Sequence, residues 1–211
     1  MSLTFYDFPM APSPRRARIL LAEKNVPHDT VLVDLRTEEQ LGDEYKKINP
    51  FCTVPALQLE DGTVLTENHG ITAYLEAAYP EPPMMGSTPA EKGLVANWSI
   101  KAELEGLWAI AEALRNSAPA MKDRAVTGPN NYAQIPELAE RGRARLAVFY
   151  DVLNERLEGR DYIAIDTFSM ADITAVVAVD FSRVIKQTPG EHHTNILRWR
   201  ESLRDRPSLN L

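Results

Sequence analysis

The chain has 211 residues and a formal net charge of −7, which disfavours a partner that presents a phosphate backbone, such as a nucleic acid. Its length allows one large domain or two small ones, and its balance of apolar and charged residues is that of an ordinary globular protein. No apolar run approaches the roughly 18 residues of a membrane span, and MSLTFYDFPM lacks a signal-peptide pattern. A single cysteine, Cys52, excludes an internal disulfide. We therefore expect a cytoplasmic protein with no membrane and no nucleic-acid partner.

The first fifty residues predict a β-α-β-α order. Residues 3–6 indicate a strand, and the three prolines that follow predict a loop. Ser13 is a favourable N-cap and Pro14 a favourable first residue for a helix that ends near Lys24. Residues 30–33 indicate a second strand, and residues 38–48 a charged helix that stops before Pro50.

The stretch 53–79 continues this order as β-β-α. A proline, Pro55, enters a hairpin of residues 56–59 and 63–65, which turns at Glu60-Asp61-Gly62. Residues 66–68 are polar and open an amphipathic helix. A β-α-β unit that feeds an antiparallel hairpin predicts a mixed four-stranded sheet with helices packed on it.

Residues 79–86 mark a boundary, because the prolines and the glycine there cannot continue a regular element. Beyond it the pattern is helical. We expect a first domain over residues 1–80, a linker over 81–87 and an all-α domain over 88–211. The helices of this second domain are expected over residues 88–116, 134–157, 169–185 and 191–204.

The most specific local signal is Phe168-Ser169-Met170-Ala171-Asp172-Ile173. Ser169 is expected to cap a helix and Asp172 to reach back to the Ser169 amide, as in a capping box. The residues that follow are apolar nearly all round, so the helix should be buried in the domain core. This motif predicts structure and no chemistry.

The sequence resembles the cytosolic glutathione S-transferases, and most of all their bacterial serine- or cysteine-type members. The resemblance rests on Asn49-Pro50, Val54-Pro55-Ala56-Leu57, Leu65-Thr66-Glu67-Asn68 and the motif at 168–173, which occur in the family's order across nearly the whole chain. It implies a thioredoxin-like domain, an all-α domain and a homodimer that uses glutathione as co-substrate and no metal.

The resemblance also implies which residues bind glutathione. In the family the proline at the position of Pro55 is cis, so that the backbone of Val54 pairs with the peptide in a small strand addition. The start of the helix at Glu67 and Asn68 suits a carboxylate, because its amides are unpaired and carry partial positive charge. The backbone N–H and the side chain of Asn68 would hold the γ-glutamyl carboxylate, and the Glu67 carboxylate would hold the α-amine. Asparagine at 68 departs from the family's usual serine.

The group that activates the thiol remains open at this level. A hydroxyl hydrogen bond and a helix N-terminus would both favour the thiolate, and Ser13 is placed to supply both. In some serine-type classes the position of the functional serine, counted back from the first helix, falls nearer Ala11, which has no hydroxyl. Tyr6 on the first strand and a backbone amide are further candidates. Cys52 lies two residues before Val54 and is a candidate for a mixed disulfide.

An electrophile pocket is expected to include Met10, Trp108, Ala111 and Arg115. In similar dimers an acid on the long helix reaches the other subunit's ligand, and here Glu103 or Glu105 would be that acid. The four histidines show no metal-ligand spacing.

We therefore expect a glutathione transferase, active in detoxification, that conjugates small hydrophobic electrophiles. The alternatives are a glutathione-dependent peroxidase, thiol reductase or isomerase, and a non-catalytic glutathione-binding module of the same fold.

Overall fold

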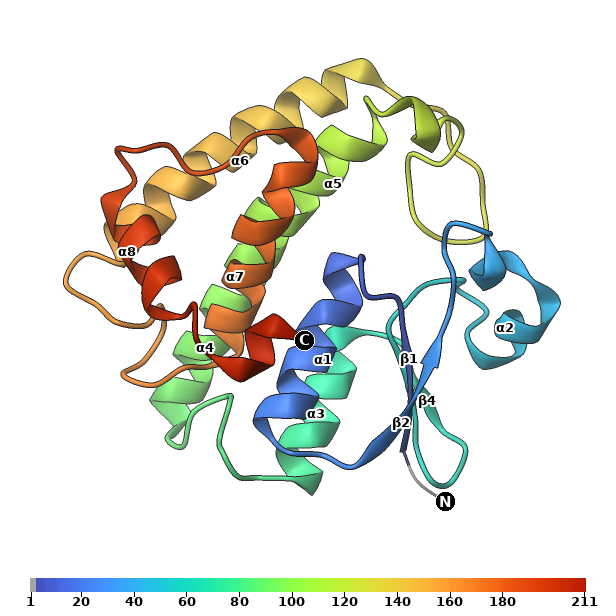
Figure 1. The fold of residues 1–211 in the computed structure, drawn as a ribbon, viewed down its shortest axis with the longest axis horizontal. Helices are drawn as coiled ribbons and strands as arrows, with labels where there is room; N and C mark the ends of the chain where they lie inside the picture. The colour runs from blue at the N-terminus through green and yellow to red at the C-terminus, as the bar shows by residue number, and fades with distance from the viewer. Residues whose placement is uncertain (1–2) are drawn as a thin grey trace. The chain divides into compact units, whose positions relative to one another are not determined.

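The computed structural model describes residues 3–211, so Met1 and Ser2 of the N-terminal stretch discussed above lie outside the described residues. The chain forms two compact units (Figure 1). The first unit runs to Pro82 and also takes in Val126–Asn130 and Leu211, and the second holds Pro83–Ala125 and Asn131–Asn210. None of the described helices combines the length and the apolar character that a membrane crossing needs.

The first unit is built on a mixed sheet of four strands. In chain order these are β1 (Leu3–Asp7), β2 (His28–Leu32), β3 (Ala56–Gln58) and β4 (Val64–Leu65). Their order across the sheet is β2-β1-β3-β4. Strand β1 is parallel to β2 and antiparallel to β3, which in turn is antiparallel to β4. The sheet expected from the sequence is therefore confirmed, including its closing hairpin.

Helices cover both faces of this sheet. Helices α1 (Pro12–Glu23) and α3 (Asn68–Ala78) pack side by side on one face, and α2 (Asp43–Ile48) lies on the other (Figure 1). The large aliphatic residues of α1 and α3 that face the sheet are fully buried, in agreement with the 3.6-residue pattern of these two helices. The buried residues include Ile19, Leu20, Leu21, Ile71 and Leu75.

Two local predictions in this unit are wrong. Helix α1 begins at Pro12 with Ala11 as its N-cap, so Ser13 lies inside the first turn and is not the cap. Pro12 and Pro14 are both tolerated there, because first-turn amides have no partner within the helix. The expected helix 38–48 is split into a short 3-10 turn, Glu39–Leu41, and α2, because Gly42 takes an extended backbone.

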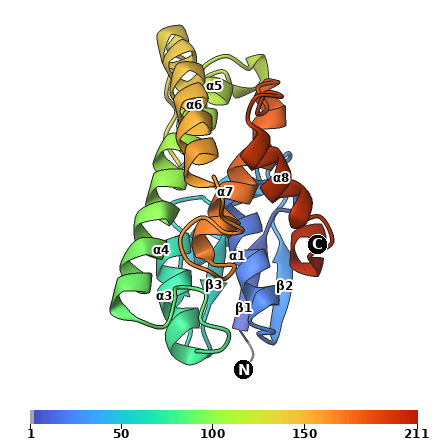
Figure 2. The ribbon, with the colours of Figure 1, turned by 90° about the vertical axis from the view of Figure 1, so that its left-hand side faces the viewer.

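The second unit is helical (Figure 2). Its helices are α4 (Pro89–Lys101), α5 (Trp108–Arg115), α6 (Pro136–Arg156), α7 (Met170–Phe181) and α8 (Thr194–Ser202). Shorter 3-10 turns occupy Pro119–Met121, Ser182–Ile185 and Pro207–Asn210. Helix α6 packs along α5, where a Cβ added at Gly142 would lie 2.5 Å from the Ala109 carbonyl oxygen. Only glycine permits this approach.

The single helix expected over 88–116 is helical from α4 to α5, but its middle is not an α-helix. Between α4 and α5, residues Ala102–Leu107 form a π-helical segment. Gly106 in this segment faces Phe149 and Ala178, and an added Cβ would lie 3.0 Å and 3.1 Å from their side chains. A π segment inserts a wider turn into a helix. The sequence of residues 88–116 gives no sign of this turn, because helical character is predicted on both sides of it.

The capping motif at the start of α7 is confirmed. The Asp172 carboxylate accepts the Ser169 N–H at 3.0 Å, the Ser169 hydroxyl at 2.9 Å and the Ile163 N–H at 2.9 Å. Burial raises the pKa of Asp172 to about 6, although these hydrogen bonds act in the opposite direction. The carboxylate thereby joins the start of a buried helix to the preceding loop.

Candidate functional site

Three segments of the first unit meet at one end of the sheet, as the strand register shows. Tyr6 pairs with Ala56, so the end of β1 and the start of β3 lie together. Leu57 pairs with Leu65, so β4 also ends there. The chain therefore brings the loop before α1, the Val54-Pro55 step and the start of α3 to the same end of the sheet.

The Val54-Pro55 peptide bond is cis. Val54 is almost buried and packs with Val33 and Tyr45, with Phe8 of the β1–α1 loop against the cluster. Neither the N–H nor the C=O of Val54 forms a hydrogen bond with another described residue. Since buried backbone groups are nearly always paired, this pair is suited to a ligand that presents its own backbone.

The loop before Val54 is held by Asn49. The Asn49 side-chain NH₂ donates to the Thr53 carbonyl at 2.8 Å and to the Thr53 hydroxyl at 3.1 Å, and its oxygen accepts the Phe51 N–H at 2.9 Å. The Tyr45 hydroxyl also donates to the Thr53 carbonyl, at 2.7 Å. These bonds fix the direction in which the chain enters Val54.

Glu67 is the N-cap of α3 and is exposed, with no side-chain capping bond. The first i→i−4 hydrogen bond at this end of the helix runs from the Ile71 N–H to the Glu67 carbonyl, at 2.9 Å. The amides of the first turn therefore form the electropositive end to which a carboxylate binds. Asn68 differs from Glu67 in being 4% exposed.

The structure gives the Asn68 side chain a partner that the sequence did not indicate. Its NH₂ donates to the Ser13 hydroxyl oxygen at 2.9 Å and to the Ser13 carbonyl at 3.1 Å, across 55 residues of chain. The bonds join the first turns of α1 and α3. The Asn68 side-chain oxygen is buried and accepts no hydrogen bond from a described residue, so it is available to a donor on a ligand.

The loop that precedes Ser13 is fixed by a charge pair. Arg18 donates to both carboxylate oxygens of buried Asp7, at 2.8 Å and 2.6 Å, and to the Pro9 carbonyl at 3.2 Å. The end of β1, the loop and α1 are thereby held together. Sequence reasoning missed this pair, because an acid and a base that are 11 residues apart in different elements leave no periodic signal.

The rival candidates for thiol chemistry are placed less favourably than Ser13. The Tyr6 hydroxyl donates to Gln58 at 3.1 Å, and Gln58 lies further along β3 from its Pro55 end. Cys52 is 2% exposed, and its thiol points at the Pro50 carbonyl, 3.6 Å away. Ala11 is the N-cap of α1 and offers no hydroxyl.

The expected electrophile-pocket residues lie on both units. Met10 belongs to the first unit and is 73% exposed. Trp108, Ala111 and Arg115 belong to the second and share one face of α5 at helical spacing. Arg115 donates to the Arg124 carbonyl at 2.7 Å, and burial lowers its pKa from the usual value. A shared pocket for these four residues stays a prediction.

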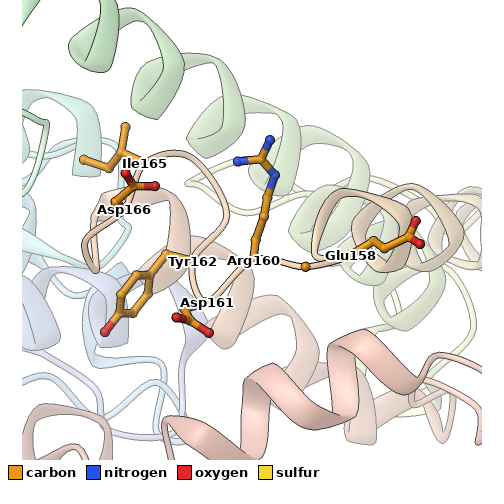
Figure 3. A pocket seen from close by; sticks show the side chains of 7 residues that line it. Glu158, Arg160, Asp161, Tyr162, Ile165 and Asp166 are labelled. Carbon is orange, nitrogen blue, oxygen red and sulfur yellow. The ribbon is translucent and has the colours of Figure 1, made fainter.

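Two further features of the second unit form no convincing site. A cavity of about 410 Å³ lies along the loop 158–166, but its side chains spread apart (Figure 3). Asp151, His192 and His193 bring potential ligand atoms within 4.8 Å of one another. However, the Gly190 N–H donates to Nδ1 of His193 at 2.9 Å, which places the proton on Nε2, 3.2 Å from Asp151. Both ring nitrogens of His193 are thus already used.

Glu105, one of the two acids considered on the long helix, is bound by an arginine of its own chain. Arg145 donates to the Glu105 carboxylate at 3.2 Å and 3.3 Å, and also to Glu112 at 3.2 Å. Arg141 binds the other oxygen of Glu112 at 2.7 Å. Glu105 therefore belongs to a charge network that ties the π segment and α5 to α6.

The first unit is a thioredoxin-like domain, and the second is an all-α domain. Residues 11–78 match the model of the glutathione S-transferase N-terminal domain, and residues 117–207 match that of the C-terminal domain.

Comparison with individual proteins agrees. Glutathione S-transferase 2 of Saccharomyces cerevisiae is 33% identical over 210 residues, which cover 98% of this chain and 88% of that protein. The crystal structure of Gtt2 from Saccharomyces cerevisiae superposes with a TM-score of 0.89 at 32% identity, covering 98% of each chain. A glutathione S-transferase domain-containing protein from Marinobacter aquaeolei gives a TM-score of 0.87 at 30% identity, covering 98% of this chain and 99% of the other. The chain belongs to the glutathione S-transferase family.

Proposed function

We propose that the protein is a glutathione transferase that joins the sulfur of glutathione to an electrophilic carbon of a small hydrophobic compound. The observation that carries the proposal is the convergence, at one end of the sheet, of the unpaired Val54 backbone, the N-termini of α1 and α3, and the Ser13 hydroxyl. Named glutathione S-transferases among the relatives support it.

Each group has a role that follows from its chemistry. The Val54 N–H and C=O pair with the peptide main chain of glutathione. Pro55 sets the direction of Val54. The first-turn amides of α3 bind the γ-glutamyl carboxylate, and the Glu67 carboxylate binds the adjacent α-ammonium. These contacts orient the tripeptide so that its thiol lies at Ser13.

Ser13 is the catalytic residue of the proposal. Its hydroxyl donates a hydrogen bond to the sulfur, and the positive end of α1 adds to the effect, so the thiol gives up its proton to solvent more readily. The thiolate then attacks the electrophilic carbon. A carbon–sulfur bond forms as the bond to the leaving group breaks, and the leaving group departs with that electron pair.

The finer features expected from the resemblance belong to this proposal. The protein acts in the cytoplasm as a homodimer and in detoxification, as in bacterial members of the family. Met10, Trp108, Ala111 and Arg115 contribute to the electrophile pocket. The burial of Cys52 favours conjugation over a disulfide reductase, because a reductase needs an accessible thiol.

The test compares the parent with Ser13→Ala. Calorimetry should detect glutathione binding to both proteins. Conjugation of a reactive aryl halide should fall by about tenfold to a hundredfold in the variant, since a hydrogen bond to a charged group contributes about 1.5–3 kcal/mol. Ser202→Ala is the matched control. It removes an exposed hydroxyl that donates to the Trp199 carbonyl at the end of α8, and it should leave the rate unchanged.

Two results would count against the proposal. Absence of glutathione binding by the parent would reject every glutathione-dependent function. Binding with no conjugation of any aryl or alkyl halide would favour the non-catalytic binding module. An unchanged rate in Ser13→Ala would remove Ser13 from the chemistry and leave the rest of the proposal standing.

A further inference from the structure

The direction of the hydrogen bond between Asn68 and Ser13 is fixed by the second bond that Asn68 makes. One terminal atom of the Asn68 side chain lies 3.1 Å from the Ser13 carbonyl oxygen and 2.9 Å from the Ser13 hydroxyl oxygen. A carbonyl oxygen can only accept, so this atom must be the nitrogen, with its two hydrogens. The Ser13 hydroxyl oxygen is therefore an acceptor toward Asn68.

Arg16 supplies a second donor to the same oxygen. Its Nη2 lies 3.4 Å from the Ser13 hydroxyl oxygen, and Arg16 is 5% exposed. A serine hydroxyl has two acceptor positions and one hydrogen to donate. With both acceptor positions taken, the hydroxyl can act only as a donor to anything else. No described residue accepts a hydrogen bond from it.

The surroundings of this hydrogen favour a negatively charged acceptor. Ser13 lies in the first turn of α1, at the positive end of the helix dipole; Pro12 and Pro14 have no N–H, so the Ser13 amide is the one that this turn presents before the Arg15 N–H, which donates to the Ala11 carbonyl at 3.4 Å. The guanidinium of Arg16 adds a full charge beside the oxygen. A hydroxyl that accepts from a cation becomes a stronger donor, because its electrons are drawn toward the cation.

We propose that Asn68 is a positioning residue that makes the Ser13 hydroxyl a dedicated donor to the bound thiolate. The inference rests on the proposed function and goes beyond it, because Asn68 was expected only to help bind the γ-glutamyl carboxylate of glutathione. The asparagine NH₂ cannot accept a hydrogen bond, so Ser13 can never satisfy itself by donating to it. A side chain that accepts would capture the hydroxyl hydrogen and turn it away from sulfur.

A purely structural role is the competing explanation, since the same bonds join α1 to α3. The pKa of the glutathione thiol in the binary complex separates the two, because a structural tie has no reason to move it. This pKa is measured from the ultraviolet absorbance of the thiolate as pH varies. Glutathione affinity by calorimetry and the melting temperature are measured beside it.

Asn68→Ala and Asn68→Asp are the informative variants. In Asn68→Ala the thiol pKa should rise, lowering the thiolate fraction at neutral pH about three- to tenfold, which is the effect of one ordinary hydrogen bond. Asn68→Asp keeps the shape but accepts where asparagine donates. It should raise the thiol pKa further, and it serves as the second measurement if Asn68→Ala melts too low to study.

Asn49→Ala is the matched control. Asn49 is equally buried, and its NH₂ also donates to the carbonyl and the hydroxyl of one residue, Thr53. The variant should lose stability and glutathione affinity while the thiol pKa stays at the parent's value. The double variant Ser13→Ala with Asn68→Ala should show the same thiol pKa as Ser13→Ala alone, because Asn68 acts through Ser13.

The outcomes distinguish this inference from the proposed function. A parent that binds glutathione and conjugates, with an unchanged thiol pKa in both Asn68 variants, would overturn the positioning role and leave the transferase intact. Additive effects in the double variant would also overturn it. A parent that does not bind glutathione would overturn both.

Discussion

Helices α1 and α3 are joined by polar contacts at both of their ends, and the two ends are built differently. At the C-terminal end the Lys24 ammonium binds Glu76 at 2.6 Å and the carbonyls of Tyr79 and Pro82 at 2.7 Å each. All three of its hydrogens are used, and its side chain is fully buried. At the N-terminal end Asn68 binds Ser13.

At that N-terminal end three polar groups have no partner among the described residues. They are the Ser13 hydroxyl hydrogen, the Asn68 side-chain oxygen and the Val54 backbone pair. A buried polar group that is fully paired stabilises the fold, whereas unpaired ones are costly unless a ligand completes them. The comparison therefore assigns stability to the Lys24 end and ligand chemistry to the Ser13 end.

The largest effect on stability is expected at the Lys24 end, where all hydrogens of the ammonium have partners. Lys24→Met removes the ammonium shared by one carboxylate and two carbonyls, and should lower the free energy of unfolding by about 3–5 kcal/mol, as for other broken buried pairs. Urea unfolding followed by circular dichroism measures this loss. The thiol pKa of bound glutathione should not change in the folded variant. A loss below about 1 kcal/mol, the range of an exposed pair, would contradict the comparison.

Asp172 in the helical unit is a second buried polar group whose hydrogen bonds are all made within the chain, and its pKa leads to a predicted dependence of stability on pH. The pKa of Asp172 is about 6 in the folded chain against 3.8 in the unfolded chain, because burial disfavours the charge. The folded state therefore binds more protons between these values. The stabilisation is complete below pH 3.8 and is lost as pH rises through 6, a change of roughly 3 kcal/mol.

Tryptophan fluorescence measures this effect, because the chain's three tryptophans, Trp98, Trp108 and Trp199, all lie in the helical unit. Unfolding of the parent and of Asp172→Asn should be followed from about pH 4 to about pH 7, the window set by the shift. The asparagine variant should lack the parent's decline. Equal slopes for the two proteins would contradict the assignment.

The sequence predicted the helices and strands at the two ends but not the side-chain contacts that join them. Strand and helix order, the hairpin and the Asp172 cap were readable, because each is encoded by neighbours within a few residues. The Asn68–Ser13 bond joins positions 55 residues apart, and no local pattern reports it. The same holds for Lys24 and Pro82.

The errors within elements have physical causes as well. Ser13 was predicted as a cap because Ser-Pro is a favourable helix start, but Pro12 begins the helix earlier. The π segment at Ala102–Leu107 contains Gly106, which packs closely against Phe149 on α6 and Ala178 on α7. The first error therefore arises within the local sequence, and only the second involves contacts between elements.

A smaller effect, on glutathione affinity, is expected from Glu67→Gln at the N-terminal end of α3. Glu67 is exposed, so its pairing with the α-ammonium of glutathione should contribute about 1 kcal/mol or less, or up to about fivefold in affinity. The loss should shrink at high salt, and stability should not change. Calorimetry at low and high salt measures this. Glu60→Gln is the control, because Glu60 is also exposed but lies at the hairpin turn, at the opposite end of β3. Equal losses in both variants would show a general charge effect and not a contact.

The smallest effect is expected from Cys52→Ser, which tests whether the Cys52 thiol takes part in the chemistry at the ligand end of the sheet. The Cys52 sulfur is buried beside the Pro50 carbonyl, and a serine hydroxyl can donate to that oxygen in its place. Conjugation should therefore stay at the parent's rate, and stability should change by about 1 kcal/mol or less. A glutathione-dependent disulfide reductase activity that is present in the parent and absent in Cys52→Ser would reverse this conclusion. It would mean that Cys52 becomes accessible and reacts, and that the protein's chemistry lies at the loop before Val54 and not at Ser13.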